Sequence, residues 1–174
     1  MPRADPIDMS TEEIHAYLRE RNTVILTTNG PRGHPHAVAM FYALDDPAGP
    51  GEPPTIRFAT YRSSQKVRNI ERDPKVCLLV ESGTAYHELR GVMMEGVAEI
   101  STDLARTMQT MIEANAATDS PLPPIDSIPE SVQQRMAGKR VLVSVRPTRF
   151  VSWDHGKLPR ERTPAAMGEA KAPT

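Results

Sequence analysis

The distribution of proline constrains what this chain can fold into more than any other feature of its sequence. Proline breaks helix interiors and cannot donate to a strand ladder. The chain has 17 prolines among 174 residues, about twice ordinary usage. Four fall within 47–54, four within 121–129 and five near the two ends. The other segments are therefore free to form regular structure between two proline-rich loops.

Several of those segments have the pattern of a helix. Ser10 and Glu13 have the spacing of a capping box, and Ile14, Tyr17 and Leu18 then share one helical face. The same spacing rules predict three further helices, the second of which ends before an Asp-Pro pair. The expected helices cover about 10–21, 63–71, 104–112 and 129–137.

Runs of β-branched and apolar residues predict strands in the rest of the chain. The first two strands form a hairpin around the turn 29–33, and a long later strand can bend at Gly91 or Gly96. Six strands with a few short helices indicate a mainly β, α+β domain that closes into a small barrel, because closure removes exposed sheet edges. The expected strands are 23–28, 36–42, 55–60, 76–81, 87–100 and 140–153.

Length and composition predict a single domain in a reducing compartment. The mass of 19.2 kDa fits one compact domain at 10–158, between a flexible N-terminus at 1–9 and a disordered tail at 159–174. A single cysteine, Cys77, and the lack of any long apolar stretch or signal-peptide pattern favour a cytoplasmic protein without a membrane span. The net charge of -1 provides no general field for nucleic acid or an anionic membrane.

One stretch, residues 62–75, is strongly basic within this balanced chain. It has five Lys and Arg against two Asp and Glu, a net charge of +3. Ser63, Ser64 and Lys66 lie where a helix is expected to begin. Its free N–H groups, the two hydroxyls and the ammonium can therefore converge on a phosphate. The ordinary alternative is that Ser63 caps the helix and the charges form a solvated face.

Three groups of residues give the sequence a family resemblance. They are Thr-Tyr-Arg-Ser-Ser-Gln-Lys at 60–66 with the residues up to Pro74, Glu-Leu-Arg-Gly-Val at 88–92 with Glu-Gly-Val-Ala at 95–98, and Ser-Trp-Asp-His-Gly-Lys-Leu at 152–158. Together they resemble the flavin and deazaflavin oxidoreductases that share the split β-barrel of pyridoxamine 5′-phosphate oxidase. The resemblance covers about residues 10–158 and implies a six-stranded split β-barrel of the FMN-binding type.

The resemblance also implies where a cofactor binds. Residues 60–66 match the family's phosphate segment, and strand 36–41 would lay its backbone along the cofactor ring. Trp153, together with Lys157 a few residues later, would border that ring from the second subunit of a homodimer. Small side chains at Ala37 and Ala39 agree with close approach of a flat ring, although helix packing is an alternative for them, and a core or interface anchor is one for the tryptophan. The candidate cofactor-binding residues are His36, Ala37, Val38, Ala39, Met40, Thr60, Tyr61, Arg62, Ser63, Ser64, Lys66, Trp153 and Lys157.

The sequence looks most like the branch of this family that uses the deazaflavin F420. It has Ser64-Gln65-Lys66 where the family pattern is Ser-Arg-Lys, a departure that argues against FMN. The implied function is an F420-dependent oxidoreductase that transfers a hydride between F420 and a small organic acceptor. An FMN-binding oxidase, and a non-enzymatic carrier of flavin, haem or bilin, are the alternatives. The acceptor stays open, as does the choice of Tyr61, His155 or water as proton donor.

F420 differs from FMN in carrying a lactyl oligoglutamate tail beyond its phosphate. A pocket for F420 is therefore expected to offer positive charge past the phosphate segment. The cations available to follow such a tail are Arg68, Arg72, Lys75, Lys157 and Arg160.

Histidines suggest the main competing chemistry. His34 and His36 would share one face of a strand, but two ligands alone make a poor metal site, and a third from His87 or Glu88 depends on strand pairing that the sequence does not give. We therefore expect no metal. The sequence also has neither a Gly-x-Gly-x-x-Gly fingerprint nor a glycine-flanked nucleophile elbow, which argues against a Rossmann nicotinamide site and against a serine nucleophile.

Overall fold

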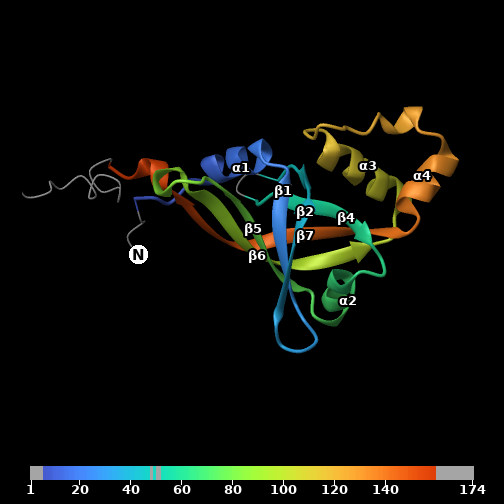
Figure 1. The fold of residues 1–174 in the computed structure, drawn as a ribbon, viewed down its shortest axis with the longest axis horizontal. Helices are drawn as coiled ribbons and strands as arrows, with labels where there is room; N and C mark the ends of the chain where they lie inside the picture. The colour runs from blue at the N-terminus through green and yellow to red at the C-terminus, as the bar shows by residue number, and fades with distance from the viewer. Residues whose placement is uncertain (1–5, 48, 50–51, 160–174) are drawn as a thin grey trace, which may run out of the picture.

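A computed structural model describes residues 6–47, 49 and 52–159 of the chain. Within them the four expected helices are confirmed, with boundaries that differ by a few residues, and three short 3-10 turns are added (Figure 1). The helices are α1 (Thr11–Glu20), α2 (Gln65–Arg72), α3 (Leu104–Asn115) and α4 (Glu130–Ala137). The 3-10 turns are η1 (Tyr86–Glu88), η2 (Ile125–Ser127) and η3 (His155–Lys157).

The first helix begins as its sequence predicts. The Ser10 hydroxyl accepts from the Glu13 amide at 3.2 Å, and the Glu13 carboxylate accepts from the Ser10 amide at 2.7 Å. This capping box satisfies amide groups that the helix itself leaves free. Tyr17 and Leu18 are fully buried against the sheet. Burial of that face, together with the cap, therefore holds α1 in place.

The described strands form one antiparallel sheet in the order β2-β1-β5-β6-β7-β4-β3. Six strands were expected and seven are found. The additional strand is a three-residue segment that directly follows the expected second strand. The strands are β1 (Thr23–Asn29), β2 (Pro35–Phe41), β3 (Ala43–Asp45), β4 (Thr55–Tyr61), β5 (Lys75–Ser82), β6 (Arg90–Ser101) and β7 (Arg140–Asp154).

The additional strand, β3, explains how the sheet closes. β2 is the last strand at one edge and β3 the last at the other, yet only Tyr42 separates them in the chain. Tyr42 is buried, its amide donates to the Asn22 carbonyl at 3.0 Å, and its hydroxyl donates to the Leu18 carbonyl at 2.6 Å. One bent run of chain therefore joins both edges, and the split β-barrel fold is confirmed.

The long strand bends at one of the two expected glycines. Pairing between β6 and β7 shifts register between Glu95 and Gly96, and Gly96 lies opposite Pro147. A Cβ on Gly96 would lie 2.8 Å from the Arg146 carbonyl oxygen, so the backbones approach too closely there for a side chain. The irregularity accommodates a proline that has no amide for the ladder. It lets β7 run as one strand through Pro147.

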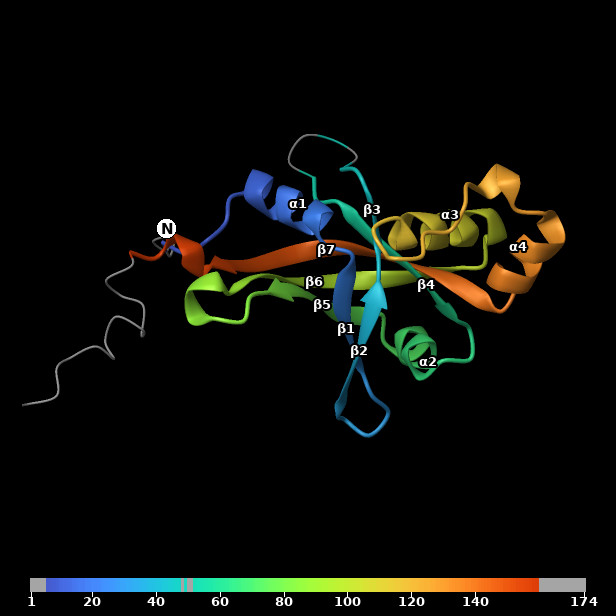
Figure 2. The same cartoon turned by 45° about the horizontal axis from the view of Figure 1, so that its top comes forward.

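Two apolar clusters support the fold. The larger fills the curled sheet beneath α1 and includes Tyr17, Phe58 and Met94. The smaller lies around α3 and α4 (Figure 2), with Met108 at its centre. A buried cation links the two parts. The Arg57 guanidinium on β4, 4% exposed, pairs with Asp45 at 2.8 Å and with Glu113 of α3 at 2.6 Å.

The described N-terminal residues pack against the last strand. The Met9 amide donates to the Ser152 hydroxyl at 3.0 Å, and the Asp154 amide donates to the Ile7 carbonyl at 2.8 Å. Of the segments expected to be flexible or disordered, residues 1–5 and 160–174 lie outside the described part of the chain. None of the described helices is long and apolar enough to cross a membrane.

Candidate functional site

The expected phosphate segment forms a compact polar corner between β4 and α2. β4 ends at Tyr61, Ser64 is the N-cap of α2, and Lys66 lies in the first turn of that helix. The Lys66 ammonium donates to the Thr60 hydroxyl at 2.9 Å. The Ser64 hydroxyl oxygen is buried, makes no capping bond and has no hydrogen-bond partner among the described residues. A hydroxyl that neither caps its helix nor meets another group is free to bind a ligand.

The charge on Lys66 is poorly compensated. Partial burial lowers the pKa of the Lys66 ammonium below its ordinary value, because removal from water disfavours the charged form. In the described part of the chain no carboxylate forms an ion pair with Lys66 or with the exposed Arg62. An anion at this corner would restore the interactions that the ammonium loses on burial.

Tyr61 has a neighbour that the sequence does not suggest. Its ring is 53% exposed. The Arg140 guanidinium lies 4.3 Å from the ring centroid and donates to the Tyr61 hydroxyl at 2.9 Å. The two residues are direct partners in the β4–β7 register although 79 positions apart in the chain. Arg140 therefore joins the predicted corner, and knowledge of that register is the only signal that would have found it.

The strand expected to face the cofactor ring has two unlike faces. Val38 and Met40 pack against the barrel core, whereas Ala37 and Ala39 lie on the exposed face. Those alanines leave room for a flat group to approach the backbone of β2. The exposed position of these alanines disfavours helix packing as the reason for their small side chains.

A cavity connects the start of this strand with α2. It has a volume of about 430 Å³ and lies between the β1–β2 turn and α2, within the range of roughly 300–1,000 Å³ typical of ligand sites. The Nδ1 atom of His36 is buried and has no hydrogen-bond partner in the described structure. The cavity thus brings His36 close to the phosphate corner. It is lined by Gly30, Pro31, Arg32, His34, Pro35, His36 and Gln65.

The C-terminal end of β7, which carries Trp153, and η3, which ends at Lys157, lie far from α2 and the phosphate corner (Figure 1). β7 runs from Arg140 to Asp154 and has 15 residues, which corresponds to a length of up to about 45 Å. The Lys157 ammonium donates to the Glu13 carboxylate at 2.6 Å and to the Asp8 carbonyl at 2.7 Å. One subunit therefore keeps the predicted residues in two separate groups.

The only tryptophan lies directly over a glycine. Trp153 and Gly91 are partners in the β6–β7 register, and a Cβ on Gly91 would lie 2.3 Å from the nearest indole carbon. We expect Gly91→Ala to displace the indole, to shift the tryptophan emission maximum and to cost about 1 kcal/mol or more of stability from overpacking.

Fluorescence and denaturant unfolding measure both effects, since no second tryptophan contributes to the spectrum. Gly49→Ala is the matched control, because a Cβ there meets no atom within 4 Å. An unchanged spectrum for Gly91→Ala would show that the indole does not occupy this position in solution.

The outer face of the sheet carries an apolar row across five strands. Register places Ala39 beside Ile25, Ile25 beside Leu79, Leu79 beside Met93, and Met93 beside Val151. All five side chains remain partly or fully exposed. Exposed apolar residues that are contiguous, rather than scattered, are typical of an interaction surface.

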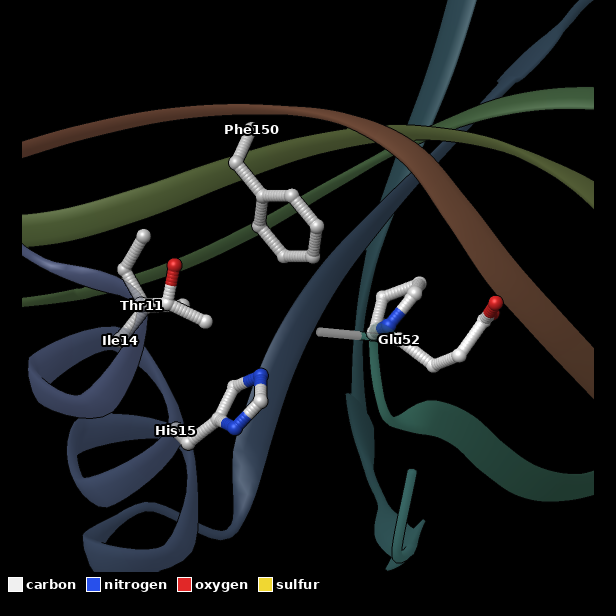
Figure 3. Close-up of a pocket in the computed structure, with 6 residues that line it drawn as sticks. Thr11, Ile14, His15, Glu52 and Phe150 are labelled. Carbon is white, nitrogen blue, oxygen red and sulfur yellow. The ribbon is translucent and has the colours of Figure 1, made fainter. Parts of the chain in front are cut away.

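Other features of the described structure give weaker evidence of a functional site. A second cavity, beside α1, has a volume of about 180 Å³, contains none of the predicted residues and is lined by Thr11, Ile14, His15, Glu52, Pro53 and Phe150 (Figure 3). No three His, Cys, Asp or Glu side chains among the described residues gather closely enough to hold a metal ion. Burial, with a smaller effect from Glu95, raises the pKa of Cys77, which disfavours a reactive thiolate.

Comparison with known proteins identifies relatives of this architecture. The family model for pyridoxamine 5′-phosphate oxidase matches residues 10–154, whereas no curated protein matches the chain. A conserved hypothetical protein from Mycobacterium tuberculosis, Rv2991, is 36% identical, with a TM-score of 0.75 and coverage of 92% of this chain and 95% of that one. A solved structure named F420 reductase is 30% identical, with a TM-score of 0.54 and coverage of 75% and 89%. HutZ, a haem storage protein from Vibrio cholerae, shares the fold at 15% identity, with a TM-score of 0.57 and coverage of 82% and 94%.

Proposed function

The chain belongs to the pyridoxamine 5′-phosphate oxidase family, and we propose that within it the protein is a homodimeric, F420-dependent oxidoreductase. The observation that carries the proposal is the corner formed by Thr60, Ser64 and Lys66, which offers a buried unpartnered hydroxyl and a poorly compensated ammonium. These groups suit a phosphate. Similarity to a protein named F420 reductase favours the deazaflavin over FMN.

The residues present fit a bound deazaflavin in three places. Ser64 and Lys66 would hold the phosphate, the exposed face of β2 at Ala37 and Ala39 would lie along the ring, and His36 would use its unpartnered nitrogen toward the ligand. The cofactor, when bound, supplies a hydride for an electron-poor organic acceptor. The protein supplies orientation of the two reactants and exclusion of water.

The proposed homodimer explains why the predicted residues form two groups. A single subunit keeps Trp153 away from Lys66, because Trp153 lies near the end of β7, whereas Arg140 at the start of that strand contacts Tyr61 of the phosphate corner. A second copy packed against the apolar row of the outer face would bury that row. In an antiparallel arrangement, it would also carry its own Trp153 toward the first copy's phosphate corner. The partner is therefore another copy of this chain, and each site is incomplete without it.

Titration of the apoprotein with cofactors tests the assignment. We expect F420 to bind more tightly than FMN, with an affinity that falls as salt rises, because exposed positive charges contribute and salt screens them. Quenching of cofactor fluorescence measures both dissociation constants.

Tight FMN binding without a response to F420 would overturn the proposal in favour of an FMN-binding oxidase. Binding of neither, together with uptake of haem or a bilin, would indicate a non-enzymatic carrier. Consumption of reduced F420 in the presence of candidate acceptors separates an enzyme from a protein that only stores its cofactor.

A further inference from the structure

The cations of this protein fall into two classes. Six have carboxylate partners in the described structure, and these are Arg19, Arg57, Arg90, Arg106, Arg149 and Lys157. Arg32, by contrast, forms no ion pair within the described residues, and it lines the cavity at the β1–β2 turn together with His34. No carboxylate lines that cavity. A concave site with basic side chains and no acidic ones attracts anions.

We propose that this cavity is a carboxylate subsite, in which Arg32 and His34 bind the acidic tail of the cofactor beyond its phosphate. The inference rests on the proposed function, since it needs a ligand with such a tail. The geometry points to this place because Gln65 borders the cavity and directly follows Ser64 of the phosphate corner. A tail that leaves the phosphate can therefore enter the cavity without crossing the protein.

Contacts beside the cavity join the end of β1 to α2 and the residue that follows it. The Asn69 side chain of α2 donates to the Thr28 hydroxyl of β1 at 2.9 Å, and Asn29 donates to the Asp73 carboxylate at 2.7 Å. Arg72 donates to the Asn29 carbonyl as well. Figures 1 and 2 both show the turn beside α2. These contacts fix the turn against the helix before any ligand arrives, which reduces the ordering cost of binding.

Contacts of this kind also engage some of the cations that could otherwise bind the cofactor tail. Arg72 is engaged with the Asn29 carbonyl, and Lys157 is engaged with Glu13 at the other end of the molecule. Arg160 lies outside the described residues. Of the cations first considered for the tail, Arg72 and Lys157 thus have other partners. Arg32 and His34 have no side-chain partner among the described residues, and both line the cavity that Gln65 borders.

Cofactor binding to the full-length protein, without any acceptor, tests the proposal. FMN is the matched ligand because it ends at its phosphate. We expect Arg32→Gln to raise the dissociation constant of F420 about two- to fivefold, the range for one partly exposed ion pair, and Arg32→Gln/His34→Gln to raise it about tenfold. FMN affinity should stay unchanged in both variants. The dependence of F420 affinity on salt should weaken in them, because fewer screened charges take part.

Arg135→Gln is the control, since it removes an exposed positive charge on α4, far from the turn (Figure 1). If wild-type protein binds F420 and the double variant binds it equally well, the subsite proposal fails while the proposed function stands. If wild-type protein does not bind F420, the proposed function itself fails. A parallel loss of F420 and FMN affinity would show damage to the phosphate corner instead, and would also overturn the subsite.

Discussion

Lys66→Ala is expected to weaken cofactor binding by about 1.5–3 kcal/mol, roughly 10- to 150-fold in the dissociation constant, which is the scale of a charge-assisted hydrogen bond. Lys66 is the cation at the phosphate corner that is partly withdrawn from water, and its described partner is the neutral hydroxyl of Thr60. The substitution therefore removes the positive charge that would face the ligand, and it leaves no buried carboxylate without a partner. Calorimetric titration with F420 and with FMN measures the effect, and both ligands should lose affinity.

The pH dependence gives an independent readout of the same residue. The ammonium is charged below its lowered pKa and neutral above it, so phosphate affinity should be retained below that pKa and lost as pH rises through it. Lys66→Ala should lack this alkaline decline. Arg135→Gln is the control, because Arg135 is exposed on α4, away from the phosphate corner. Equal affinities for wild-type protein and Lys66→Ala would mean that the basic segment is only a solvated face.

Leu79→Arg is expected to convert the proposed dimer into a monomer. Leu79 lies in the middle of the apolar row, between Ile25 and Met93, and a guanidinium buried there without a partner costs several kcal/mol. Wild-type protein at micromolar concentration should sediment at about twice its 19.2 kDa chain mass, and the variant at the chain mass. Since the proposed site takes Trp153 from the second copy, cofactor affinity should fall as well.

A surface variant separates this effect from a general consequence of added charge. Ala105→Glu places a carboxylate on the exposed side of α3, near its N-terminus, where a negative charge is tolerated. It should remain dimeric and bind cofactor normally. A monomeric wild-type protein that still binds F420 tightly would contradict the shared site, whatever the state of the variants.

Local patterns in the sequence predict most of the secondary structure and the Ser64–Lys66 part of the proposed site. The capping box at Ser10 and the hairpin turn each depend on residues within one short segment. The same holds for Ser64 and Lys66, which a single turn of helix brings together. Such features could be predicted because a capping bond or a glycine requirement acts over a few positions.

Features that depend on strand register could not be predicted in this way. Tyr61 meets Arg140 only because β4 pairs with β7, and Arg57 meets Glu113 only because α3 packs over β4. The strand β3 was missed because three residues carry too little pattern to distinguish them from the strand before. The distance between Trp153 and Lys66 also follows from the length of one strand, which the family resemblance does not convey.

The separation of the site residues along β7 has a genetic consequence. If each site takes Lys66 from one chain and Trp153 from the other, a chain that lacks Lys66 and a chain that lacks Trp153 are both inactive as homodimers. A mixed dimer of the two contains one site with both residues intact and one site with neither. Two alleles that lack different residues of this pair would then complement each other when expressed together. Two alleles that lack the same residue would not.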